Sequence, residues 1–131
     1  MEAVVDTNFV IAVIFKDHEH HEEALKEWVG INRAYLPLIS LTEIAYFLIK
    51  NDVNLGIMDE VLSDPKIEVT ANTADDLRFA VENGDRIAGY DDFNDFLILS
   101  VDRRLRLPLL TFDRKLEEEE RLKSQNTNHW F

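Results

Sequence analysis

Two acidic residues, far apart in the sequence, each end a short apolar run. Asp6 directly follows Ala3-Val4-Val5, and Asp113 closes the run that begins at Pro108. Such runs predict buried strands, and in an open parallel sheet the carboxyl ends of the strands meet at the edge that holds the binding site. Asp6 also precedes a predicted apolar helix, and aspartate is a preferred N-cap residue. Its side chain could therefore cap that helix or take part in chemistry.

A third acid, Glu43, opens an apolar helix that follows the strand predicted at 33–38. Ser40 and Glu43 match a capping box, in which the glutamate serves its own helix. Alternatively, Glu43 projects across the same sheet edge as Asp6, because it lies in the first turn of a helix that follows a strand. These two uses compete for one carboxylate, and the sequence leaves both open.

The fourth acid lies in the segment from Tyr90 to Val101, where aspartates come close together. Asp91 and Asp92 precede Asp95 by four and three residues, so each would face the same way as Asp95 on a helix. One of the first two would cap that helix. We select Asp95 as the functional acid, because it leads directly into Phe96-Leu97-Ile98-Leu99. A carboxylate beside such an apolar wall is costly unless it is paired, hydrogen-bonded or metal-bound.

Predicted strands alternate with predicted helices, which indicates the α/β class with a largely parallel sheet and right-handed crossovers. The expected strands are 3–5, 33–38, 67–70 and 108–112, and residues 129–131 would add an edge strand. This arrangement brings strand ends and the following helix starts to one edge.

The four acids Asp6, Glu43, Asp95 and Asp113 would converge at that edge. Converging carboxylates repel one another, so a bound divalent cation is the natural compensation. Oxygen ligands favour Mg²⁺ or Mn²⁺ over zinc. Asp6 and Asp113 would be the most direct ligands, because both end strands.

Length and charge narrow the functional classes. At 131 residues the chain has the size of one domain, residues 1–131. A net charge of −12 argues against a non-specific nucleic-acid coat, but not against an enzyme whose carboxylates hold cations. Without cysteine, disulfides and thiolate metal sites are excluded. No leader peptide and no apolar run close to the roughly 20 residues of a membrane span are present, so we expect a soluble, cytoplasmic protein with no membrane partner.

The helix from Ile44 to Ile49 is apolar almost all round. Tyr46, Phe47 and Ile49 cannot all face one core, so part of this helix should form an exposed apolar stripe. We therefore predict a homodimer.

Three histidines, at positions 18, 20 and 21, lie close together before an amphipathic helix that ends near Gly30. They suggest a metal site, but a polar first turn is the commoner explanation. No Glu or His elsewhere has an obvious role in completing such a site.

The acidic residues with their neighbours resemble the PIN-domain family. The resemblance rests on Asp6-Thr7-Asn8, Leu41-Thr42-Glu43, Asn94-Asp95-Phe96 and Thr111-Phe112-Asp113, in the family's order and over nearly the whole chain. It is closest to the single-domain toxins of VapBC toxin–antitoxin systems. The resemblance implies a three-layer α/β/α PIN-like fold with a central, mainly parallel sheet. It also implies a metal-dependent endoribonuclease, with RNA as the substrate and an antitoxin protein as a partner.

The same resemblance assigns roles to residues. Asp6, Glu43, Asp95 and Asp113 would be the catalytic acids. The metal ligands would be Asp6, Asp95 and Asp113, while Asn8, Thr111 and Asp92 would orient the acids. Arg114 and Lys115, just past Asp113, are candidates for binding RNA phosphates. Alternatively, they pair with the acidic run 117–120, as charges on a solvated helix often do.

Other families fit less well. A receiver domain wants an acidic pair by its first strand and a lysine after its last, but Asp6 is followed by Thr7-Asn8 and no lysine stands at the equivalent strand end. A haloacid-dehalogenase-type phosphatase needs an acid where Asn8 stands. A dinucleotide-binding fold needs clustered glycines after the first strand, where this chain has none. The non-enzymatic alternative is a PIN-like binding or regulatory module without nuclease activity.

Overall fold

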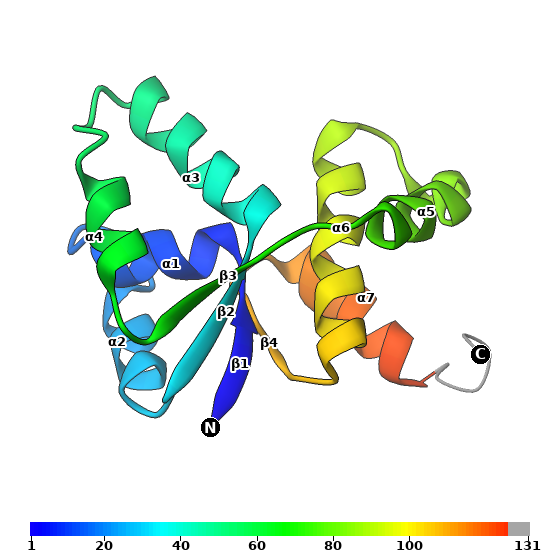
Figure 1. Cartoon of the computed structure of the whole chain (residues 1–131), viewed down its shortest axis with the longest axis horizontal. Coiled ribbons are helices and arrows are strands. Elements are labelled where there is room, and N and C mark those ends of the chain that lie inside the picture. The colour runs from blue at the N-terminus through cyan, green and yellow to red at the C-terminus, as the bar shows by residue number, and fades with distance from the viewer. Residues whose placement is uncertain (126–131) are drawn as a thin grey trace.

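The computed structural model describes residues 1–125, which form a four-stranded parallel sheet with helices on both sides (Figure 1). The strands are β1 (Glu2–Val5), β2 (Arg33–Pro37), β3 (Ile67–Thr70) and β4 (Leu109–Leu110). Their order across the sheet is β3-β2-β1-β4, and all three neighbouring pairs are parallel. The predicted α/β class with three layers is therefore confirmed. The edge strand expected at 129–131 lies outside the described residues.

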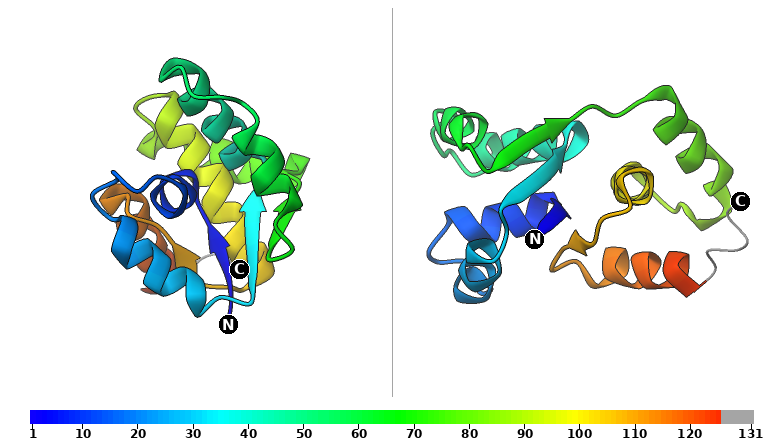
Figure 2. Two further views of the ribbon diagram at one scale, coloured as in Figure 1. Left: turned by 90° about the vertical axis from the view of Figure 1, so that its left-hand side faces the viewer. Right: turned by 60° about the horizontal axis from the view of Figure 1, so that its bottom comes forward.

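Helices cover both faces of this sheet, with α1 to α4 on one side and α5 to α7 on the other (Figures 1 and 2). None of the helices in residues 1–125 is long and apolar enough to cross a membrane. Their bounds are α1 Thr7–Ile14, α2 His21–Val29, α3 Leu38–Lys50, α4 Ile57–Ser63, α5 Ala74–Glu82, α6 Tyr90–Leu105 and α7 Arg114–Gln125, with a short 3₁₀ turn at Gly84–Arg86.

The start of α3 differs from the prediction. The helix begins at Leu38, directly after Pro37, and its N-cap makes no side-chain hydrogen bond, so of the two alternatives left open for Glu43 the capping box with Ser40 is wrong. The side chain of Asn72 instead accepts the Ile39 N–H at 2.8 Å. Glu43 therefore lies in the second turn of α3, and its carboxylate is available for other contacts.

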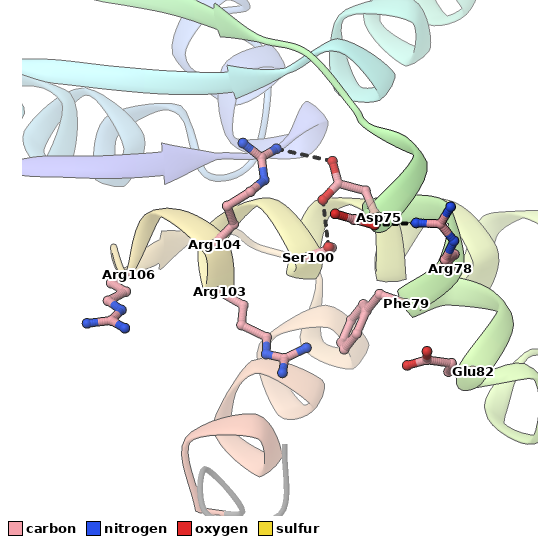
Figure 3. A pocket seen from close by; sticks show the side chains of 9 residues that line it. Asp75, Arg78, Phe79, Glu82, Ser100, Arg103, Arg104 and Arg106 are labelled. Carbon is pink, nitrogen blue, oxygen red and sulfur yellow. Dashed lines mark hydrogen bonds and ion pairs between the residues drawn. The ribbon is translucent and has the colours of Figure 1, made fainter. Parts of the chain in front are cut away.

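A buried polar cluster joins α5 to α6 beside a cavity lined partly by arginines (Figure 3). Asp76 accepts hydrogen bonds from Ser100 Oγ at 2.7 Å and Arg104 at 3.1 Å, and forms a capping box with Thr73. Burial alone would raise the pKa of Asp76, but the hydrogen bonds from Ser100, the Thr73 N–H and Arg104 outweigh it and lower the pKa. Asp76 therefore both caps α5 and connects it to α6.

Asp76→Ala should lower the free energy of unfolding by about 3 kcal/mol, because it removes a cap and leaves the Ser100 hydroxyl without its buried acceptor. The neighbouring Asp75→Ala is the control, since Asp75 is exposed and, within the described residues, pairs with the exposed Arg78 alone. That surface pair is worth less than about 1 kcal/mol. Denaturant midpoints of the two variants measure the difference, and equal losses would contradict the role of Asp76.

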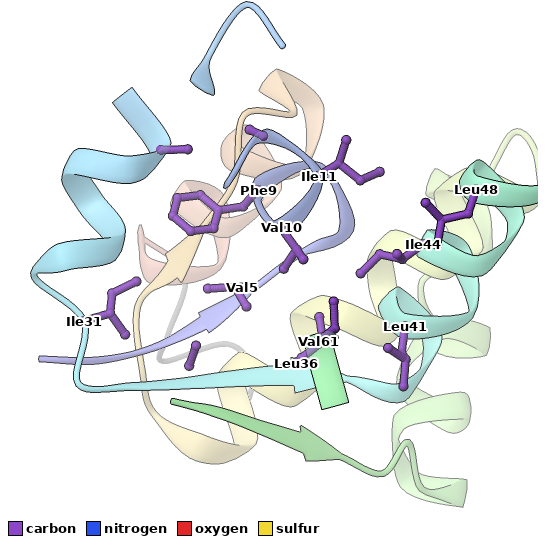
Figure 4. Packing of buried hydrophobic residues seen from close by; sticks show 13 residues of the cluster. Val5, Phe9, Val10, Ile11, Ile31, Leu36, Leu41, Ile44, Leu48 and Val61 are labelled. Carbon is purple, nitrogen blue, oxygen red and sulfur yellow. The ribbon is translucent and has the colours of Figure 1, made fainter. Parts of the chain in front are cut away.

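The larger hydrophobic core lies between the sheet and helices α1 to α4 (Figure 4). Its buried members include Val5, Phe9, Val10, Leu36, Ile44 and Leu48. A second cluster on the α5 to α7 side contains Phe79, Phe96, Ile98, Leu99 and Leu116. The central strand β1 is buried on both faces at Ala3, Val4 and Val5, which explains its continuous apolar run.

Candidate active site

Asp6 lies where β1 passes into α1, in the middle of the sheet. The residue is only 2% exposed. One oxygen accepts the Phe9 N–H at 2.9 Å, so Asp6 is the N-cap of α1. The other oxygen accepts a hydrogen bond from the hydroxyl of Thr111, just past β4. Two strand ends that are separated by about a hundred residues in the sequence thus meet at this carboxylate.

Glu43 reaches the same edge from the second turn of α3. Its Oε1 accepts a hydrogen bond from Thr7 Oγ1 at 2.6 Å, and its Oε2 lies 3.4 Å from the amide nitrogen of Asn94. The alternative that Glu43 projects towards Asp6, rather than capping α3, agrees with these contacts. The sequence analysis assigned no role to Thr7 or Asn94. Thr7 directly precedes Asn8 and Asn94 directly precedes Asp95, and both of those residues were assigned roles.

Asp113 follows β4 and precedes α7, whose first free N–H groups it caps. Its Oδ1 accepts the N–H of Lys115 at 2.9 Å and of Leu116 at 3.2 Å. Its own N–H donates to Thr111 Oγ1 at 3.0 Å. Thr111 therefore touches both Asp6 and Asp113, which is the orienting position expected of it.

Asp95 stands apart from its two neighbouring aspartates. Asp92 accepts the Ala88 N–H at 2.8 Å and forms an ion pair with Lys115. Asp91 is exposed. The Asp95 carboxylate is partly buried and makes no hydrogen bond with the described residues, yet it feels the charges of Asp113 and Glu43. Of the three, the acid that lies with the other members of the quartet is Asp95.

The pKa values of Asp6 and Asp95 reflect their burial and the other acids that lie near them. Burial, followed by the charges of Asp113, Glu43 and Asp6, raises the pKa of Asp95 to about 8. Burial, together with the charges of Asp113 and Glu43, raises the pKa of Asp6 to about 7, against the opposing hydrogen bonds from Thr111 and the Phe9 N–H. The charges of Asp113 and Glu43 thus add to burial in destabilising the ionised forms of Asp6 and Asp95.

Other predicted residues lie near the acids but in different arrangements. Asn8 is exposed, and its side chain makes no hydrogen bond within residues 1–125. Lys115 pairs with Asp92, whose hydrogen bond raises the pKa of the ammonium group. Arg114 is exposed and forms no ion pair within the described chain. The alternative that these two cations pair with the acidic run 117–120 is therefore wrong.

The donor set at this edge consists of carboxylates, with amide and hydroxyl oxygens nearby. Within residues 1–125, no three Asp, Glu or His side chains already stand close enough to hold a metal ion. Asp6, Glu43 and Asp113 make hydrogen bonds instead, to Thr111, Thr7 and the start of α7 respectively. The Asn94 Oδ1 and Ser40 Oγ atoms are buried without a partner among the described atoms. Oxygen atoms of these types suit Mg²⁺ or Mn²⁺ and their bound waters.

Comparison with known proteins agrees with this architecture. The family model for the PIN domain matches residues 3–121. The structure is similar to that of Mycobacterium tuberculosis VapC20, a sarcin-ricin loop cleaving toxin, with a TM-score of 0.77 and 20% identity over 89% of this chain and 94% of that one. It is also similar to a chain of a toxin–antitoxin complex from Klebsiella pneumoniae, with a TM-score of 0.63 and 20% identity over 86% of this chain and 88% of that one. No curated protein matches the sequence. The chain belongs to the PIN-domain family.

Proposed function

We propose that this protein is a metal-dependent endoribonuclease and the toxin of a toxin–antitoxin pair. The observation that carries the proposal is the grouping of Asp6, Glu43, Asp95 and Asp113 at the carboxyl edge of the sheet, where burial and the neighbouring acidic charges raise the pKa values of Asp6 and Asp95. The similarity to a sarcin-ricin loop cleaving toxin supports RNA as the substrate. The proposal places the protein in the cytoplasm, where such a substrate would be found.

Asp6, Asp95 and Asp113 would hold Mg²⁺ or Mn²⁺, with Glu43 completing the acidic quartet. A cation bound there supplies a Lewis acid that lowers the pKa of a water molecule and stabilises the leaving oxygen of a phosphodiester. Cation binding would draw together carboxylates that repel one another without it. The proton on Asp6 or Asp95 would leave as the cation binds, because metal ligands must be deprotonated.

The surrounding side chains would keep each acid in place. Thr111 donates to Asp6 and accepts from the Asp113 N–H, so it holds the acids of two strand ends at a constant spacing. Thr7 holds Glu43 in the same way. Asp92 restrains Lys115 at the rim, where the ammonium group also faces the charges of Asp95 and Asp113. These contacts hold the carboxylates at the carboxyl edge of the sheet.

The direct test is to incubate the purified protein with single-stranded RNA, duplex RNA and single-stranded DNA, with Mn²⁺ and with EDTA. Cleavage of RNA with Mn²⁺ and none with EDTA is the expected result. Metal-independent binding without cleavage of any of the three would instead support the alternative, a PIN-like binding or regulatory module.

Arg114→Ala should weaken RNA binding and flatten its salt dependence, by about 0.7 units of log–log slope for one lost phosphate contact on a single strand. Arg114 is the stronger candidate because it is unpaired within the described chain, whereas Lys115 is neutralised by Asp92. Lys115→Ala should therefore change the slope less. Fluorescence anisotropy at several salt concentrations, with Ca²⁺ as the cation, measures both slopes. Arg121→Ala is the control and should keep the wild-type slope. Equal slopes in Arg114→Ala and wild type would show that Arg114 does not contact the RNA.

We also propose a homodimer formed through the exposed side of α3. Tyr46 is 66% exposed and Ile49 61% exposed, so the predicted apolar stripe is present on this helix. Light scattering should give a dimer for the wild type and a monomer for the double variant Tyr46→Glu and Ile49→Glu. Val29→Glu, at an exposed apolar position of α2, should stay dimeric. A monomeric wild type at working concentration would contradict the dimer.

The complex from Klebsiella pneumoniae supports an antitoxin protein as a second partner.

A further inference from the structure

A cavity of about 320 Å³ adjoins the acidic quartet on the side of α2 and α7. It is lined by Phe9, His20, Glu23, Glu27, Leu110, Thr111, Phe112, Arg114 and Glu117. Thr111 connects it to the site, because the same side chain donates a hydrogen bond to Asp6. A cavity of this size lies at the lower end of small-ligand pockets, which measure roughly 300–1,000 Å³.

The apolar part of this cavity is a stack of three aromatic rings. His20 lies parallel to Phe112, with centroids 4.5 Å apart and an interplanar angle of 6°. Phe112 in turn stacks on Phe9, at 5.6 Å and 13°. Beyond His20 no further ring lies parallel to the stack among the described residues: the His18 ring is tilted by 43° with its centroid 5.7 Å away, and the His20 side chain is 37% exposed. A flat ring that entered the cavity could continue the stack over His20.

The polar part of the cavity consists mainly of hydrogen-bond acceptors. Glu23 lies 3.4 Å from the His20 ring nitrogen. Glu27 on α2 and Glu117 on α7 are exposed, and their carboxylates make no hydrogen bond or ion pair within residues 1–125. A carboxylate accepts two parallel hydrogen bonds when the ligand presents two adjacent donors. The guanidinium of Arg114, which forms no ion pair within residues 1–125, also lines the cavity and is able to bind a phosphate.

These features match one nucleobase better than the others. Unpaired RNA bases are recognised by stacking on aromatic side chains, histidine included, and by hydrogen bonds to their Watson–Crick edges. Guanine presents two adjacent donors on that edge, N1–H and the N2 amino group. Adenine and cytosine place an acceptor nitrogen beside their amino group, and uracil places a carbonyl on each side of its single N–H. A carboxylate faces two donors only in guanine.

We propose that this cavity, formed by the His20 stack and the carboxylates of Glu27 and Glu117, binds an unpaired guanine next to the phosphodiester that is cleaved. The inference rests on the proposed function, because it places an RNA base beside the acidic quartet. It makes His20 a residue that positions the base, while the carboxylates of Glu27 and Glu117 select guanine. The three clustered histidines thus contribute a base-stacking ring, where the sequence suggested a polar first turn or a metal site.

Two measurements test the proposal independently. In the first, randomised single-stranded RNA is cleaved with Mn²⁺ and the new ends are sequenced. The wild type should cut next to guanine about tenfold more often than next to uracil, the factor expected of one bidentate contact. His20→Ala and the double variant Glu27→Gln and Glu117→Gln should lose most of this preference, while His20→Phe keeps the stack and retains it. Cleavage without any base preference would overturn the guanine site and leave the nuclease proposal standing.

The second measurement does not need catalysis. Calorimetric titration with guanosine, adenosine, cytidine and uridine monophosphates, without metal, should show guanosine monophosphate binding about tenfold more tightly than uridine monophosphate. The matched controls are Glu22→Gln and Glu118→Gln, which alter exposed carboxylates next to the cavity that do not line it. Both should keep the wild-type preference. Equal binding of the four nucleotides, or the same loss of preference in the control variants, would overturn the proposal even if no RNA were cleaved.

Discussion

Asp95→Asn should lower the rate of RNA cleavage by at least about 100-fold, whereas Asp91→Asn should leave it within about twofold. The two residues lie one turn apart on α6, but only Asp95 faces the other acids of the quartet. Loss of a partner that merely orients a metal ligand already costs about 10–100-fold in metal affinity or activity. Loss of a carboxylate that holds the cation should cost at least as much.

The measurement is the initial rate of cleavage of one single-stranded RNA at saturating Mn²⁺, for wild type and both variants. Asp91 is a suitable control because it carries the same charge as Asp95, lies on the same helix and has an exposed side chain. Circular dichroism must show that all three proteins are folded. Equal rates for wild type and Asp95→Asn would exclude Asp95 as the third acid, and a large loss in Asp91→Asn would assign that role to its neighbour.

The metal-free protein should lose stability as the pH rises from 5 to 8, by about 2 kcal/mol in total. The pKa values of Asp6 and Asp95 are about 7 and 8 in the folded state, against an ordinary value of 3.8. The folded state therefore binds more protons than the unfolded state between these limits. The stabilisation is fully present below the unfolded pKa and is lost as the pH rises through the folded pKa values. Mutual screening and relaxation keep the total below the sum of the separate shifts.

Asp6→Asn should remove part of this pH dependence. Asparagine is as good an N-cap as aspartate, so its side chain can still accept the Phe9 N–H while carrying no charge. At pH 8 the metal-free variant should be about 1–2 kcal/mol more stable than the wild type, and at pH 4 the two should be nearly equal. Urea unfolding at each pH measures the difference.

Added Mn²⁺ provides a second readout of the same site. It should stabilise the wild type at pH 8, because a ligand that binds the folded state alone shifts the unfolding equilibrium by mass action. It should stabilise Asp6→Asn much less. Asp91→Asn should follow the wild type in both series. A flat pH profile for the metal-free wild type, or equal stabilisation of all three proteins by Mn²⁺, would contradict the grouping of charges described above.

The sequence determined the order of elements and the positions of the strand ends. The apolar runs before Asp6 and Asp113 are buried strands that pair directly, with Val5 in register with Leu110. Such runs are visible in the sequence because a strand of a parallel sheet is covered on both faces. The acidic residues at their ends were visible with the runs, and in the structure both Asp6 and Asp113 also accept N–H groups at the start of the helices that follow them.

Tertiary structure decided which side chains meet, because those contacts join segments that no local pattern relates. Ser40 and Glu43 matched a capping box locally, yet α3 begins at Leu38 and Glu43 binds Thr7 of another helix. Lys115 stands beside an acidic run in the sequence but pairs with Asp92, 23 residues away. Hydrogen bonds and ion pairs reach only a few ångströms, so such choices depend on how the helices pack across the sheet. The aromatic stack of His20 and Phe112 arises in the same way, from a loop and a strand end that meet only in the folded chain.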